Sequence, residues 1–174
     1  MKKTLIFIIF MVAVAGIVGV SAFNKNLEDV VGYVDGQAVK AAQLQNYVNE
    51  LLGSNYQKKM DTAEGRQELF NHYVNRKLLL EYAKENIETE DSFVVSHTMG
   101  EVSEETALIS AVLKKEVNDK VQYTEEDVKA LMAADTRFTN MQDAEREVIS
   151  QKRVELFYTF MEKVKSNHKI ELAG

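Results

Sequence analysis

The chain contains no proline in its 174 residues. Proline lacks a backbone donor and interrupts helices and central strands, so its absence leaves few places where a helix is forced to end. Glycine is also sparse, with eight residues, two of them in an apolar N-terminal run. This pattern favours long helices and predicts a mainly α fold.

Apolar residues recur at helical spacing along most of the chain. The first predicted helix covers residues 41–52 and ends at Gly53. A longer one follows to about Asn86 and has a wide apolar face. We expect it to begin at Asp61, because Asp61 and Glu64 have the spacing of a capping box.

The second half of the chain continues the helical pattern. Residues 91–121 are predicted to be helical, with a break at Gly100. Another helix is expected to begin after Thr124, which can cap it with Asp127 at the third helical position. After an interruption around residues 136–141, the last predicted helix runs to about residue 166.

Two segments, one on each side of the predicted helices, have strand character instead. Residues 30–39 place two short apolar runs around Asp35 and Gly36, a pair typical of a tight hairpin turn. Residues 169–172 alternate like a strand. The sequence therefore predicts one multi-helix domain over residues 30–174, with a small β-sheet formed by an N-terminal hairpin and a C-terminal strand, preceded by a linker over residues 23–29.

The N-terminus resembles an export signal. Lys2 and Lys3 precede an apolar run from Leu5 to Val20, and the small side chains before and at Ala22 predict cleavage after that residue. Residues 1–22 are thus predicted to be a signal peptide. The alternative is an uncleaved inner-membrane anchor over residues 5–23, which approaches the length that spans a bilayer. Either way, the rest of the chain is expected to be periplasmic or otherwise extracytoplasmic, because basic flanks stay inside.

Composition excludes several classes of protein. The chain has no cysteine, so a disulfide framework and an N-terminal lipid anchor on cysteine are both excluded. Cleavage after Ala22 would remove two lysines and no acid, which leaves 19 basic against 27 acidic side chains and a net charge of −8. Nucleic acid is therefore not an expected partner.

No catalytic motif is found in the sequence. It lacks a glycine-rich phosphate loop, a nucleophile elbow, a paired-histidine zinc motif and an acidic calcium loop. His72, His97 and His168 are far apart in sequence, and a half-buried or helix-end position explains His72 and His168 without a catalytic role. Acidic runs are explained by helix starts. We expect no metal, no cofactor and no enzymatic activity.

In order and character, these elements resemble the chaperone domain of SurA/PrsA/PpiD-type exported foldases. The first strand, the Asp35–Gly36 turn and the following helix are similar to the opening of that family. Residues 73–84 resemble its long second helix, and the Thr124–Val128 helix start and residues 151–172 resemble its closing elements. The resemblance implies a cradle of helices that binds unfolded or assembling exported proteins without ATP.

The chain departs from this family in two places. The foldases usually carry a parvulin-type prolyl isomerase domain before the closing helix, whereas only about residues 136–143 lie there in this chain. A domain needs at least about 50 residues, so an isomerase domain is absent from that position. Lys40 also stands where the family tends to place a capping serine or threonine.

The resemblance implies a client-binding surface of adaptable apolar side chains. The expected contacts are those in the less regular segments, namely Phe93, Met99, Met132, Phe138 and Met141. The alternative is that these side chains belong to the core.

Three functional hypotheses remain open on the sequence. The first is a periplasmic holdase whose partners are unfolded exported proteins, including outer-membrane or envelope-complex components. The second is a non-catalytic structural or assembly subunit that docks on one envelope complex. The third, an accessory to prolyl isomerisation, is disfavoured by the missing domain. The sequence does not decide between a monomer and a homodimer.

Overall fold

The computed structural model describes residues 29–100 and 102–173. The predicted signal peptide over residues 1–22, its cleavage site at Ala22 and the alternative anchor over residues 5–23 lie outside these ranges, as does most of the linker. Within the described part of the chain, no helix has the length and apolar character that crossing a bilayer requires.

The two ends of the described chain meet in one antiparallel sheet. Its strands are β1 (Val30–Val34), β2 (Gln37–Lys40) and β3 (Ile170–Leu172), in the order β2-β1-β3. The turn between β1 and β2 has positive φ at both Asp35 (52°) and Gly36 (77°), as a type I′ hairpin requires. The predicted hairpin, the closing strand and their meeting in a sheet are all confirmed.

Asp35 fastens the closing strand to the hairpin. Its backbone N–H donates to the Lys169 carbonyl, and its Oδ1 accepts from the Lys169 N–H, both at 2.8 Å. Its Oδ2 lies 2.8 Å from Nδ1 of His168. These hydrogen bonds, that from His168 first, hold the pKa of the Asp35 carboxyl below its ordinary value of 3.8.

After the hairpin, the chain forms two neighbouring helical segments. Helix α1 (Ala41–Tyr47) continues into a single π-helical turn, η1 (Val48–Leu52), and the segment stops at Gly53 as predicted. The start of α1 lacks the usual capping hydroxyl because its N-cap is Lys40. The side chain of Gln43 compensates by accepting from the Lys40 N–H at 2.8 Å.

The predicted start of the long second helix is wrong by one residue. Asp61 ends a 3-10 helix, η2 (Ser54–Asp61), that the sequence did not reveal, and Thr62 is the N-cap of α2 (Ala63–Asn86). The Thr62 hydroxyl accepts from the Gly65 N–H at 3.0 Å. A threonine N-cap accepts from the backbone N–H of the third helical residue, as an aspartate N-cap would. Asp61 cannot take this role because it is the last residue of η2.

The remaining helices follow the predicted pattern. They are α3 (Ser92–Thr98), α4 (Glu104–Glu116), the short η3 (Asn118–Lys120), α5 (Glu125–Ala134) and α6 (Met141–Lys165). The break between α3 and α4 falls at the predicted position. Thr124 and Asp127 form the expected reciprocal capping box at the start of α5.

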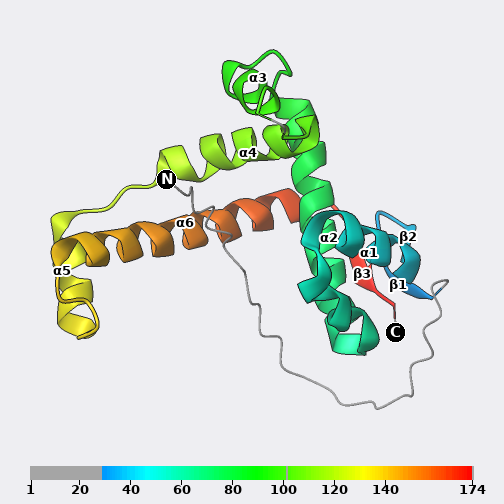
Figure 1. The fold of residues 1–174 in the computed structure, drawn as a ribbon, viewed down its shortest axis with the longest axis horizontal. Coiled ribbons are helices and arrows are strands. Elements are labelled where there is room, and N and C mark those ends of the chain that lie inside the picture. Colours follow the sequence, from blue (N-terminus) through cyan, green and yellow to red (C-terminus); the bar gives the residue numbers. More distant parts are fainter. Residues whose placement is uncertain (1–28, 101, 174) are drawn as a thin grey trace.

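The main core lies where the sheet, α1, α2, α3, α4 and the C-terminal half of α6 come together. Helix α2 passes through its centre (Figure 1). The ring of Phe70 lies directly against Gly32 of the central strand. The largest fully buried side chains are Leu44, Leu69, Phe70, Leu78 and Leu108. The fold is therefore mainly α with a small sheet, as the sequence predicts.

A second, smaller cluster lies away from this core. We call the arm the part of the chain formed by residues 121–158, which comprises α5, the 135–140 connection and the N-terminal part of α6. Its cluster consists of Val128, Ala144 and Val148, with Leu131, Met132 and Phe138 packed around them. Figure 1 shows the arm extending from the body at the end of α6 that is farther from the sheet.

The close crossing of η2 over the start of α2 depends on Gly65. A Cβ at Gly65 would lie 2.1 Å from the carbonyl oxygen of Lys59 and 2.7 Å from its Cα. Gly65→Ala should therefore lower the free energy of unfolding by about 1–3 kcal/mol, although the same change in an open helix stabilises. Gly100→Ala is the control, because its nearest neighbour is 3.4 Å away. Urea unfolding measures both, and a Gly65→Ala variant as stable as the parent would contradict the packing.

The link between Asp35 and His168 predicts a pH dependence of stability. A carboxyl group with a lowered pKa stabilises the native state above its unfolded pKa, and this contribution is lost as the pH falls through its folded pKa. Asp35→Asn keeps a residue suited to positive φ but removes the charge. Thermal unfolding should show the variant less stable than the parent at pH 7, with the difference shrinking below about pH 4. A difference that stays constant with pH would refute the role of the charge.

Candidate functional site

Local sequence signals position the arm. At the start of α5, the Asp127 N–H donates to the Thr124 hydroxyl at 3.2 Å and the Thr124 N–H donates to Asp127 Oδ2 at 2.8 Å. At the start of α6, the Asn140 side chain accepts from the Asp143 N–H at 2.9 Å. Both helices of the arm thus have satisfied first turns, and the short connection between them brings the two helices into contact.

The arm buries few of its apolar side chains completely. Only Val128, Ala144 and Val148 are buried in its cluster, while Met132 and Phe138 remain half-buried at its edge. In contrast, the main core fully buries large side chains from nearly every element of the body. A surface that keeps partly exposed apolar groups around a thin cluster can exchange solvent for the side chains of another protein.

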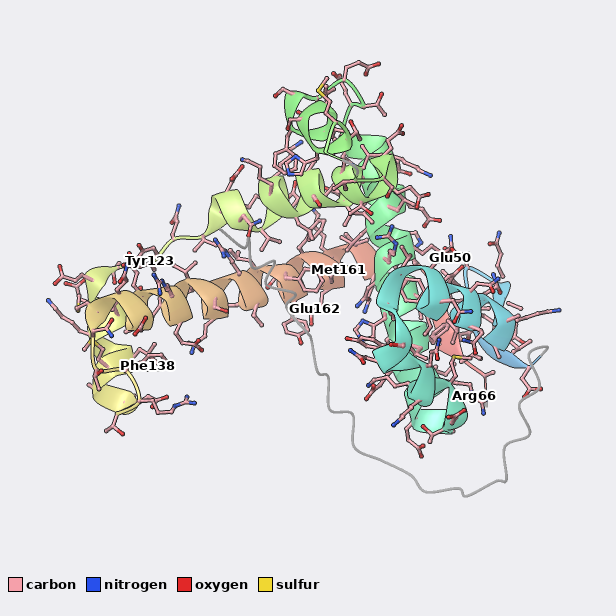
Figure 2. All side chains as sticks on the ribbon, viewed as in Figure 1. Glu50, Arg66, Tyr123, Phe138, Met161 and Glu162 are labelled. Carbon is pink, nitrogen blue, oxygen red and sulfur yellow. The ribbon has the colours of Figure 1, made fainter. Side chains whose placement is uncertain are left out.

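Further apolar side chains are exposed along the arm. Tyr123 is 39% exposed, Met141 43% and Tyr158 38%. Ile149 and Val154 on α6 are half-buried and belong to neither hydrophobic cluster of the described residues. Figure 2 places Tyr123 and Phe138 at the far end of the molecule, well separated from Arg66 and Glu50 beside the sheet. The arm thus presents apolar surface from its tip to the middle of α6.

The five predicted client contacts do not form one surface. Phe93 lies in the first turn of α3, packs against the main core and stacks on His97 with ring centroids 3.9 Å apart. Its position favours the core alternative. Met99 caps the C-terminus of α3 and is 83% exposed, so it projects from a different part of the molecule than the arm.

The other three predicted contacts gather on the arm. Met132 and Phe138 pack against the arm cluster, and Met141 is the first residue of α6. The guanidinium of Arg137 lies 5.7 Å from the centroid of the Phe138 ring. The expectation that all five residues lie in irregular segments is wrong, since only Met99 and Phe138 lie outside helices. Phe93 already fell within a segment predicted to be helical, and α6 begins at Met141, inside the predicted interruption.

Sequence reasoning missed Tyr123 and Tyr158 as candidate contacts. Tyr123 directly precedes the capping residue Thr124, and its hydroxyl donates to the Glu145 side chain on α6. Tyr158 falls inside an apolar stretch of α6 and looks like a core position. The available sign was that Tyr158 lies two residues before the buried Phe160, which places it on the opposite side of the helix from that side chain.

The electrostatics of the arm are dominated by carboxylates. The hydrogen bond with the Glu145 carboxylate raises the pKa of Tyr123 above its ordinary value. The bonds from Thr124 lower the pKa of Asp127. The first shift keeps the Tyr123 hydroxyl protonated, and the second favours an ionised Asp127 at neutral pH.

Each basic side chain of α5, the connection and the first turns of α6 is already paired. Lys129 Nζ lies 2.7 Å from Glu125 Oε1, and Arg137 Nη2 lies 2.6 Å from Asp135 Oδ2. Arg146 Nη1 is 3.4 Å from Asp143 Oδ1. These pairs are exposed and contribute little to stability, but they neutralise one another locally.

The histidines have separate surroundings. His72 on α2 is half-buried with its ring edge against Tyr56, and burial lowers its pKa. His97 stacks on Phe93, and His168 contacts Asp35. In the part of the chain that the structure describes, no group of three or more histidine, cysteine or acidic residues has the arrangement of a metal site.

Comparison with known proteins places this fold in a family. A family model described as the SurA-like N-terminal domain matches residues 1–98, which is more than half of the chain. The match includes the hairpin, α1, α2 and α3, whereas α4, α5 and α6 lie beyond it. No curated protein and no solved structure matches the chain. Because this match covers more than half of the chain, we conclude that the chain belongs to the family of SurA-like N-terminal domains.

Proposed function

We propose that this protein is an ATP-independent extracytoplasmic chaperone that holds unfolded or assembling exported proteins, and that its arm is the main client-binding surface. The observation that carries the proposal is the arm itself, which leaves apolar side chains exposed around a cluster with only three buried residues. Membership of the SurA-like family supports the general role. The arm lies outside the matched residues, so its part in binding is argued from geometry alone.

The side chains of the arm suit reversible binding of a client. Met132, Phe138 and Met141 offer polarizable or aromatic surface that adapts to unlike partners without a fixed register. Because each is only partly exposed, a client that covers them gains a modest amount of buried apolar area. Weak contacts of this kind release a client by dissociation alone, and no nucleotide is needed.

We propose further that the chain acts without prolyl isomerase activity. Residues 135–140 join α5 directly to α6, at the place where the resembling foldases carry their isomerase domain. Six residues are far below the roughly 50 that an independent domain requires. Binding without catalysis is therefore the role that this arrangement supports.

The proposed cellular setting follows from the N-terminus. We propose that residues 1–22 direct export, that residues 23–29 form a linker and that residues 30–174 act outside the cytoplasm. The sequence pattern of two lysines, an apolar run and Ala22 supports cleavage. An uncleaved segment over residues 5–23 would instead station the same chaperone at the inner membrane.

An aggregation assay tests the proposal. The exported part of the chain should suppress the aggregation of a chemically unfolded client without ATP. The double variant Met141→Ser/Tyr158→Ser should suppress it less than half as well, because it removes exposed apolar area from the arm while leaving both hydrophobic clusters intact.

Leu51→Ser is the matched control for that assay. Leu51 is 47% exposed on the body, so the substitution removes one exposed apolar side chain away from the arm. It should leave the suppression of aggregation unchanged. Equal losses in the arm variant and in the control would refute the assignment to the arm, and no suppression by the parent protein would refute the holdase.

Crosslinking in intact cells separates the holdase from the dedicated subunit. A photoreactive residue in place of Met141 should trap many different unfolded envelope proteins, because an adaptable apolar surface selects little by shape. The same probe in place of Leu51 should trap few. One recurring, stoichiometric complex at Met141 would instead favour a subunit that docks on a single assembly.

A further inference from the structure

One side of α6 combines apolar groups with a carboxylate in an ordered row. Met141, Glu145 and Ile149 follow at four-residue spacing, so they lie along the same side of the helix. Tyr123 joins the row, because its hydroxyl donates to Oε1 of Glu145. Met141 and Tyr123 are exposed, and Glu145 and Ile149 are half-buried. We call this row the α6 edge.

The charge around this edge is strongly negative. Residues 123–148 contain seven carboxylates and three basic side chains, a net charge of −4, although the whole chain carries only −6. The three basic side chains are paired with Glu125, Asp135 and Asp143. The carboxylates beyond these pairs are Glu126, Asp127, Glu145 and Glu147.

Glu145 is the member of that set that lies within the apolar row. Met141 lies one helical turn before it and Ile149 one turn after it. The Tyr123 hydroxyl, from the segment before α5, donates to it. Among the described residues, Glu145 has no ion pair with a lysine or arginine. A partner that covers the edge therefore leaves a buried negative charge without neutralisation, unless the partner supplies a positive charge.

From this edge we infer that the arm selects client segments in which apolar residues are interleaved with lysine or arginine. The inference rests on the proposed function, since it names the class of client that the same surface binds. An apolar segment without positive charge would leave the Glu145 carboxylate desolvated with no cation to neutralise it, whereas a basic segment forms an ion pair with it. Acidic segments are repelled by the remaining carboxylates of the arm.

Two labelled peptides with the same apolar residues test this inference. One carries lysines and the other glutamates at the same positions between the apolar residues, and fluorescence anisotropy measures their binding to the exported part of the chain. The basic peptide should bind more tightly, and its advantage should shrink as salt is raised, because the contact is solvent-accessible. The substitution Glu145→Gln should reduce this advantage about two- to fivefold at low ionic strength.

The glutamine in that variant can still accept the Tyr123 hydroxyl, so the arm keeps its local structure. The control is Glu162→Gln, which makes the same change of charge on the same helix but beside the body (Figure 2). It should leave the ratio of the two affinities unchanged.

The outcomes distinguish the inference from the proposed function. Equal binding of both peptides, or a preference that Glu145→Gln and Glu162→Gln reduce equally, would overturn the selection by charge while leaving the holdase in place. If neither peptide binds and the aggregation of a client is not suppressed, the proposed function fails as well. A preference lost only in Glu145→Gln would support both.

Discussion

The arm depends on one uninterrupted helix that belongs to both hydrophobic clusters. The C-terminal half of α6 is held in the main core by Phe160, Met161 and Val164, and the ring of Phe160 meets Tyr82 of α2 edge to face at 5.1 Å. Its N-terminal half carries the arm cluster. A ten-residue helix such as α5 is not stable alone in water, so it persists because α6 offers it an apolar face already anchored elsewhere. The packing of α6 in the main core thus stabilises an arm whose own apolar side chains remain partly exposed.

Much of the fold could be predicted because its determinants are local. The Asp35–Gly36 turn, the Thr124 cap with Asp127, and the break before α4 are each encoded within a few residues. The 3-10 helix η2 could not be predicted, since its apolar residues are few and it is held by crossing α2 at Gly65. The start of α2 was misplaced for the same reason: Asp61 and Thr62 are both good caps, and only the preceding turn decides between them.

The candidate site was less predictable than the fold. Phe93 and Met141 were both predicted as client contacts from their residue type. In the structure, Phe93 packs on the main core and Met141 is exposed on the arm. That difference arises from which helices meet, and apolar spacing along one helix does not specify it. Tyr123 shows the same limit, because its hydrogen bond to Glu145 joins residues 22 positions apart. The pairing of an exposed aromatic group with a carboxylate becomes visible only when α6 lies beside the segment that precedes α5.

The order of the strands has a consequence for how this chain acquires its structure during synthesis. The central strand β1 pairs with β2 at once but with β3 only across the chain, and His168 and Asp35 are 133 residues apart in sequence. Closing so long a loop costs conformational entropy, and this cost is offset only when the C-terminal strand pairs with β1. A chain that emerges N-terminus first therefore keeps one edge of β1 unpaired until nearly all of it has been made. During that interval this protein has the same exposed backbone as the unfolded chains we propose that it holds.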